Sequence, residues 1–169
     1  MGAEASVFRT SRRVEFRDTD AAGLAHFSVF FVWMESVEHE FWRHLGEPLV
    51  MPLGPTHQAG VVTHPRPSTG GDIVSWPRVA AACDYEGAVR FGDVLAVELA
   101  VERVGRTSVR FGFRFAIGSQ TVAIGSMTAV RCILRPGERP EPVRIPEVLR
   151  ERLEAHRTTA SKPAPGSAD

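Results

Sequence analysis

The segment from Val14 to Gly46 constrains the fold of this chain most, because it joins an acidic turn to a strongly apolar helix. At its start, Val14 and Phe16 alternate with polar residues, which is the period of a half-buried β-strand. From His26 to Leu45 apolar residues recur three and four positions apart, which predicts an α-helix of about 18 residues that ends at Gly46. The first half of this helix is apolar on almost every side, so we expect it to be deeply buried, whereas polar residues that include Glu38 make its second half amphipathic.

The turn before the helix carries two acids and a glycine, Asp18, Asp20 and Gly23, which are favoured turn residues. A helix start has unpaired backbone N–H groups and a partial positive charge, so it would stabilise the negative charge that develops on an attacked carbonyl. Asp20 would stand beside that carbonyl. Such a pair needs no metal, no cofactor and no Ser/His/Asp triad, and it suits attack on an activated ester such as a thioester. A purely structural role in the turn is the alternative for both acids.

The run DTDAAGLAHF, followed by Trp33, Met34 and Glu35, resembles the hot-dog-fold acyl-CoA thioesterases of the 4-hydroxybenzoyl-CoA thioesterase type. A looser likeness continues in the segment from Cys83, which resembles the central strands of that family. The resemblance implies hydrolysis of an acyl-CoA to the free acid and CoA. It also implies that Asp20 is the catalytic carboxylate and that the backbone N–H of Phe27 polarises the thioester carbonyl.

Other site residues follow from the same resemblance. Gly23 belongs to the substrate-binding turn, and His26 either orients water or Asp20 or packs at the helix start. Glu35 lies where the family can have an acid that recognises the acyl group, although an exposed helical glutamate is the commoner case. Phe30 is either core or acyl pocket. Val29 and Phe30 stand where the family often has Asn and Tyr, so we expect a more apolar pocket and a different acyl group, or weakened activity.

For CoA, the resemblance implies that the acyl arm threads between two subunits while the phosphates lie at the surface. Arg106 matches a phosphate-contact region at a corner between two strands, and Ser108 could add a hydroxyl contact, with Arg103 and Thr107 as further helpers. A solvated surface charge is the alternative for Arg106. Exposed sheet edges and a helix too large for one sheet to cover predict a homodimer, or a homotetramer built from two dimers.

Further strands are predicted by alternation and by apolar runs between turn residues: Trp76 to Asp84, Val94 to Val104, Ser108 to Ile117 and Gln120 to Leu134. Gly118 and Ser119 form a hairpin turn between two of them. A short helix is predicted from Ile145 to His156, with Pro146 in its first turn. The element order predicts an α+β fold in which one long helix packs on one curved antiparallel sheet, the hot-dog arrangement.

We expect one hot-dog domain over residues 1–157 and a flexible, polar tail over residues 158–169. Residues 47–75 are rich in proline and glycine and predict a long loop, which either covers the acyl pocket or belongs to a dimer surface. Within this loop, Val61 to Thr63 predicts a short strand, and His57 and His64 are expected to be solvated.

Composition fits a cytoplasmic globular protein. The chain has 20 basic and 20 acidic residues, so bulk charge favours neither a nucleic-acid nor a membrane partner. No apolar stretch reaches the length of a signal peptide or of a membrane span. Cys83 and Cys132 stand alone in apolar runs and are expected to be buried free thiols.

Two other functions stay open on the same fold. A non-catalytic module that binds acyl-CoA or an acyl carrier would bind its ligand tightly without turnover, and the apolar Val29 and Phe30 make this conceivable. A dehydratase or hydratase is less compatible, because the helix-entry segment lacks an evident His-plus-Asp pair of that family.

Overall fold

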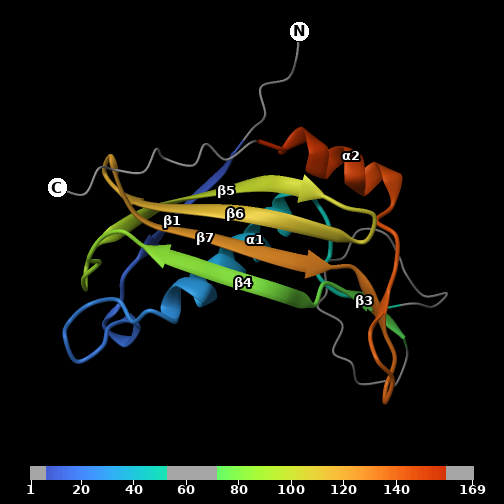
Figure 1. Cartoon of the computed structure of the whole chain (residues 1–169), viewed down its shortest axis with the longest axis horizontal. Coiled ribbons are helices and arrows are strands. Elements are labelled where there is room, and N and C mark those ends of the chain that lie inside the picture. Colours follow the sequence, from blue (N-terminus) through green and yellow to red (C-terminus); the bar gives the residue numbers. More distant parts are fainter. Residues whose placement is uncertain (1–6, 53–71, 159–169) are drawn as a thin grey trace, which may run out of the picture.

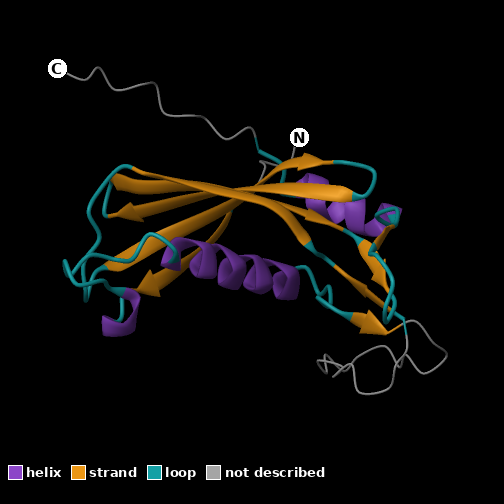
Figure 2. Ribbon diagram, turned by 60° about the horizontal axis from the view of Figure 1, so that its bottom comes forward, coloured by secondary structure: helices purple, strands orange, loops and turns teal. Residues whose placement is uncertain are grey.

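A long helix lies across one face of a five-stranded antiparallel sheet (Figure 1, Figure 2). The computed structural model describes residues 7–52 and 72–158. The helix is α1 (Val29–His44), and the strand order is β1-β5-β6-β7-β4. The strands are β1 (Phe8–Arg13), β4 (Arg78–Tyr85), β5 (Val94–Val104), β6 (Ser108–Ile117) and β7 (Gln120–Val130). The predicted α+β architecture, one helix on one antiparallel sheet, is confirmed.

A smaller antiparallel sheet extends from the end of β7. It has the order β2-β3-β8-β9 and consists of β2 (Met51–Pro52), β3 (Ile73–Ser75), β8 (Cys132–Leu134) and β9 (Glu141–Pro142). A second helix, α2 (Glu147–Ala155), contacts β5 and buries Leu149 and Leu153. Both pieces lie at the end of the main sheet that carries the β5–β6 corner (Figure 1).

The core lies between α1 and the sheet. Alternate residues of β6 line the inner face, and each is at most 2% exposed: Val109, Phe111, Phe113 and Phe115. The ring of Phe30 meets that of Phe115 edge-on at 5.4 Å, and Phe41 meets Phe111 at 5.8 Å. Each buried phenylalanine contributes about 1.5–3 kcal/mol by removal from water. The predicted core face of this strand is therefore confirmed.

Helix α1 ends as predicted and begins later than predicted. Gly46 adopts a positive φ of 70° and donates its N–H to the carbonyl of Arg43, which is the expected glycine termination. The first helical residue is Val29, three residues after the predicted start. The expectation of burial on almost every side was wrong, since Val32 is 60% exposed and Phe27, just before the helix, is 62% exposed. One sheet covers only one face of the helix.

The predicted strand from Val14 to Phe16 was wrong. Strand β1 ends at Arg13, and a 3-10 helix, η1 (Phe16–Asp18), follows. The carboxylate of Asp18 accepts the Glu15 N–H at 2.9 Å, which closes this turn and directs the Phe16 side chain outward, where it is 80% exposed. Turn chemistry therefore overrides the alternating pattern.

The remaining strands agree with expectation at most of their ends. β5 and β6 have the predicted bounds, and β4 begins two residues later than predicted and ends one later. The predicted run from Gln120 to Leu134 is interrupted at Arg131, where the chain passes from the main sheet into the smaller one. In α2, Pro146 is the N-cap residue. The predictions for 61–63, for His57 and His64, and for the tail after Thr158 lie outside the described residues.

Cys83 and Cys132 are free thiols, and Cys132 is buried as expected whereas Cys83 is half-buried. Burial raises the pKa of the Cys83 thiol to about 11. None of the helices within residues 7–52 and 72–158 is long and apolar enough to cross a membrane. In the same residues no three His, Cys, Asp or Glu side chains gather as a possible metal site.

Candidate active site

A short hairpin presents Asp20 just before α1. Thr19 pairs with Ala25, and the Asp20 N–H donates to the carbonyl of Leu24 at 2.8 Å. The hairpin turns at Gly23, whose φ is +72° and whose N–H donates to the Asp20 carbonyl at 3.0 Å. Because a positive φ is costly for other residues, glycine at this position keeps the turn tight. Asp20 is exposed as a result.

The carboxylate of Asp20 is fixed on one side and open on the other. Its Oδ1 accepts the N–H groups of Ala22 at 2.8 Å and Leu24 at 3.3 Å. Among the described residues, Oδ2 has no hydrogen-bond partner. Asp20 therefore has the structural role expected of a turn acid, and the same two bonds orient its free oxygen.

The start of α1 is uncapped by any side chain. Its N-cap residue, Ser28, makes no capping bond with its hydroxyl, and the first turn contains no acid. Instead Ser28 Oγ lies 2.7 Å from His26 Nδ1, and the Ser28 N–H points at the same nitrogen at 3.3 Å. In the described part of the chain the Phe27 N–H meets no acceptor. An electropositive amide is thus left unsatisfied at the mouth of the helix.

His26 and Phe27 form one rigid unit. The His26 N–H donates to the Asp18 carbonyl at 2.8 Å, and the His26 carbonyl accepts the Val29 N–H at 2.9 Å. The peptide group that carries the Phe27 N–H is therefore held by bonds on both sides of it. The His26 ring stacks obliquely on the Phe27 ring at 4.4 Å. These contacts make His26 part of the helix start, and its imidazole is engaged with Ser28 rather than with Asp20.

Two predicted substrate-binding residues lie farther along α1. Phe30 is only 3% exposed and packs among Trp33, Tyr85 and Phe115, so its ring belongs to the core. Glu35 is half exposed and takes part in an ion network, with its carboxylate 3.7 Å from Arg78 and 3.9 Å from the His39 ring. The helix face that bears Glu35 therefore lies next to the start of β4.

One buried acid, Glu38, was not predicted from the sequence. It was assigned to the polar face of the helix, yet its side chain is fully buried. It accepts hydrogen bonds from Trp42 Nε1 at 3.0 Å and from the Arg78 guanidinium at 2.7 and 2.9 Å. Burial raises the pKa of Glu38, opposed by Arg78 and Trp42. Its position four residues after Met34 and four before Trp42, both core residues, is the signal that would have found it.

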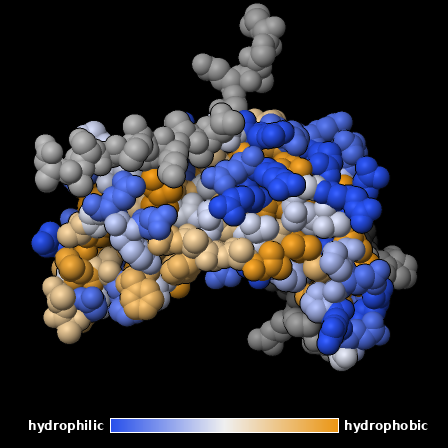
Figure 3. Space-filling view, viewed as in Figure 1, coloured by the Kyte–Doolittle hydropathy of each residue, from blue (hydrophilic) through white to orange (hydrophobic). Residues whose placement is uncertain are grey.

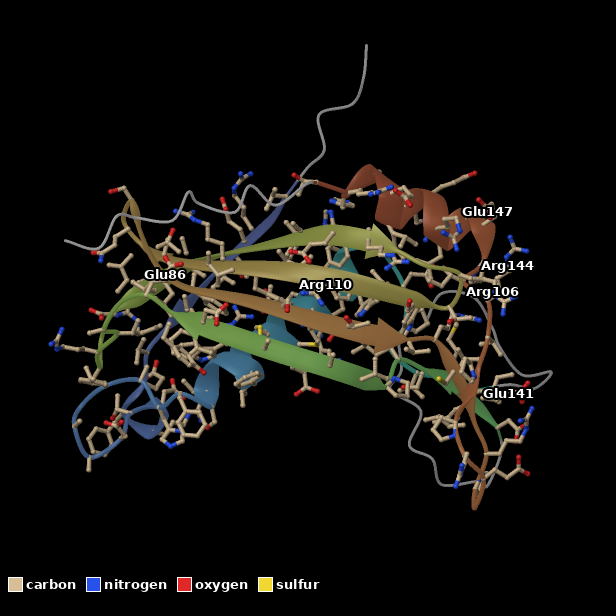
Figure 4. The ribbon with its side chains drawn as sticks, viewed as in Figure 1. Glu86, Arg106, Arg110, Glu141, Arg144 and Glu147 are labelled. Atoms are coloured by element: carbon tan, nitrogen blue, oxygen red, sulfur yellow. The ribbon has the colours of Figure 1, made fainter. Side chains whose placement is uncertain are left out.

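The predicted CoA-binding residues lie at the opposite end of the sheet. Arg106 is exposed at the β5–β6 corner, close to Arg144 in Figure 4, and Ser108 begins β6. The Asp20 hairpin adjoins the other end, where β4 finishes at Tyr85. Strand β4 separates the two ends by about 23 Å. A single chain therefore brings Asp20, Gly23, His26 and Phe27 together but keeps Arg106 and Ser108 away from them.

Comparison with known proteins identifies the family. The sequence profile of the thioesterase superfamily matches residues 22–124. The chain belongs to this superfamily. The match includes Phe27, α1, the strands from β2 to β6 and the first five residues of β7, and it begins two residues after Asp20. Membership of this superfamily of thioester hydrolases, predicted from the helix-entry motif, is thus confirmed.

Similar sequences and solved structures agree with this family assignment. A 1,4-dihydroxy-2-naphthoyl-CoA hydrolase of Prochlorococcus marinus (strain MIT 9313) is 31% identical over 134 residues, which are 75% of this chain and 83% of the relative. The crystal structure of a 1,4-dihydroxy-2-naphthoyl-CoA thioesterase from Synechocystis superposes with a TM-score of 0.68 at 19% identity, covering 88% of this chain and 96% of the other. That of a gentisyl-coenzyme A thioesterase gives 0.64 at 21% identity, covering 86% and 99%. The fold is the hot-dog fold of these thioesterases.

Proposed function

We propose that this thioesterase hydrolyses a hydroxylated aromatic acyl-CoA, releasing the aromatic acid and CoA. The observation that carries the proposal is the unsatisfied Phe27 N–H at the uncapped start of α1, close along the chain to an exposed carboxylate whose second oxygen is free. The superfamily membership supports thioester hydrolysis. The aromatic acyl class rests on the relative named 1,4-dihydroxy-2-naphthoyl-CoA hydrolase and on exposed aromatic side chains at and before the helix start, Phe16 and Phe27.

In the proposed mechanism, the thioester carbonyl oxygen accepts the Phe27 N–H, and the partial positive charge of α1 stabilises the oxyanion of the tetrahedral intermediate. Asp20 supplies the carboxylate. Its Oδ2 takes a proton from the attacking water, or attacks the carbonyl carbon to form a mixed anhydride that water then opens. Collapse of the intermediate expels the CoA thiolate. After a single turnover in ¹⁸O-water, label in the Asp20 side chain identifies an anhydride that water opens at the Asp20 carboxyl carbon, since general-base catalysis places the label in the released acid alone.

We infer that the complete site needs two subunits. Strand β4 is an edge strand whose outer rim is unpaired in the described residues, and all its residues except Cys83 are exposed. Figure 3 shows apolar side chains along this rim, where Val79 is 62% exposed. An unpaired apolar edge of this kind is a template for pairing with another strand. By contrast β1, the other edge strand, carries three arginines.

Antiparallel pairing of β4 with its copy would be self-complementary. Arg78 begins the strand, whereas Asp84 and Glu86 lie at its far end, so opposite charges of the two copies would meet. The same pairing would bring the β5–β6 corner of one subunit towards the Asp20 hairpin of the other. Arg106 of the second subunit could then bind CoA phosphate while Ser108 contributes a hydroxyl. The pairing also covers the exposed face of α1, with Glu35 beside the acyl group.

The test is thiol release from a panel of acyl-CoAs: benzoyl, 4-hydroxybenzoyl, 1,4-dihydroxy-2-naphthoyl, and aliphatic chains from short to long. The proposal expects the highest kcat/KM for a hydroxylated aromatic member. Faster hydrolysis of aliphatic members would overturn the acyl class and keep the reaction. Binding of these thioesters, measured by calorimetry, without any thiol release would overturn the reaction and favour a non-catalytic acyl-CoA binding protein.

A further inference from the structure

One polar contact joins the edge strand β4 to the start of α1. Tyr85, the last residue of β4, donates its hydroxyl to the Phe27 carbonyl at 2.7 Å. Figure 1 shows the end of β4 beside the start of the helix. Tyr85 is the only tyrosine of the chain. The two residues are 58 positions apart, so this bond is a tertiary contact and not part of a local turn.

The Tyr85 ring is itself well supported. It meets the buried ring of Phe30 edge-on at 5.2 Å, and Phe30 in turn packs on Trp33 and Phe115. Edge-on aromatic contacts favour one relative orientation of the rings. The hydroxyl is therefore held at the Phe27 carbonyl by a chain of buried aromatic side chains, although 46% of the Tyr85 surface is exposed.

The Tyr85 bond completes the restraint on the helix entrance. The His26 N–H and carbonyl are bound by Asp18 and Val29, which hold the segment from the hairpin and from the helix. The hydroxyl of Tyr85 holds the next carbonyl from the sheet. Of the backbone N–H and carbonyl groups of His26 and Phe27, only the Phe27 N–H has no hydrogen-bond partner in the described residues. An oxyanion donor works best when it is fixed before the reaction begins, because no reorganisation is then needed in the transition state.

We propose that Tyr85 is a positioning residue of the thioesterase site, which fixes the direction of the Phe27 N–H through its hydrogen bond to the Phe27 carbonyl. The inference rests on the proposed function, because it assigns Tyr85 a role in the oxyanion site. Tyr85 acts through Phe27 and takes no part in proton transfer. Burial is the first of several influences that raise the pKa of its hydroxyl, so the group stays a neutral donor at ordinary pH.

The test compares Tyr85→Phe with the wild-type chain in steady-state hydrolysis of the best acyl-CoA of the panel. Phenylalanine keeps the ring and its contacts and removes only the hydroxyl. The matched control is Thr121→Val, which removes a hydroxyl bonded to Arg114 on the sheet face turned away from α1. We expect Tyr85→Phe to lower kcat by about three- to tenfold, which corresponds to the loss of one neutral hydrogen bond. KM should stay within about twofold of the wild-type value. Thr121→Val should leave both constants unchanged.

The proposal fails if Tyr85→Phe turns over at the wild-type kcat, or if KM alone changes. Absence of thioester hydrolysis would overturn the proposed function. In that case an NMR measurement still tests whether Tyr85 positions Phe27. The ¹³C resonance of the Phe27 carbonyl should move upfield in Tyr85→Phe and not in Thr121→Val, and the Phe27 N–H resonance should broaden. Unchanged Phe27 resonances in Tyr85→Phe would overturn the positioning role.

Discussion

Replacing Arg78 with methionine should destabilise the protein strongly, because it leaves the buried carboxylate of Glu38 without its cation. Glu38 is 0% exposed and accepts three hydrogen bonds, one from Trp42 and two from Arg78. Removing one partner of a buried ion pair costs about 3–5 kcal/mol. We expect the lower end of that range, since 30% of the Arg78 side chain is exposed and water can reach the vacated position.

This loss should depend on pH, because Glu38 avoids the penalty by binding a proton. Burial raises the pKa of Glu38 above its ordinary value of 4.5 even with Arg78 present. Below pH 4.5 both folded and unfolded chains carry the proton and the penalty vanishes. As the pH rises through the raised pKa of the folded chain, the folded state loses stability relative to the unfolded state. Removing Arg78 raises that pKa further, so the destabilisation should grow towards alkaline pH.

Urea unfolding at fixed protein concentration, at about pH 5 and about pH 8, measures both effects. The matched variant is Arg78→Met combined with Glu38→Gln, in which a neutral amide can still accept the bond from Trp42. We expect the double variant to be more stable than Arg78→Met at the higher pH. An equal loss of stability for Arg78→Met at both values, or a double variant no more stable than the single one, would refute the reasoning.

Two further predictions concern packing and assembly. Gly125→Ala should lower the free energy of unfolding in urea by about 1–3 kcal/mol, since the new methyl would meet the buried sulfur of Met34. Gly112→Ala should lower it less, because the neighbour there is the flexible, half-exposed carboxylate of Glu102. Ala82 is exposed in the middle of β4. If the wild-type chain is a dimer paired through β4, Ala82→Lys should be more monomeric in light scattering and less active, because like charges would face each other across the paired strands. A wild-type chain that stays monomeric at assay concentration would contradict the two-subunit site.

The sequence predicts the strands and helix of this fold well where burial follows a simple period. β6 has the expected bounds because its apolar residues alternate clearly, and turn residues at Gly105 and Gly118 mark the end of β5 and both ends of β6. The end of α1 was predictable because Gly46 is a turn residue that ends the helix. Phe16 was misassigned because the capping bond between Glu15 and Asp18 operates over three residues and leaves no mark on hydrophobic periodicity.

The candidate site was predictable only in part. The acids and the helix start are adjacent in sequence, so local chemistry pairs Asp20 with the helix start, and the resemblance to the thioesterases adds the Phe27 N–H. Tyr85 could not, since its bond to Phe27 depends on how β4 lies beside the helix. Glu38 looked like a surface residue because its partner, Arg78, is 40 residues away. The spacing between Met34 and Trp42 indicates that Glu38 is buried, but no local pattern identifies the tertiary partners of Glu38 and Tyr85.

The central claim is that the carboxylate of Asp20 carries the hydrolysis. It is tested most directly by thiol release from the best acyl-CoA with Asp20→Asn and Asp18→Asn side by side. Asparagine can keep the backbone bonds of either acid, those of Asp18 within η1 and those of Asp20 within the hairpin that follows it. The account predicts that Asp20→Asn loses about 10²- to 10⁴-fold in kcat while Asp18→Asn stays within about tenfold of wild type. Equal rates for the two variants would contradict it.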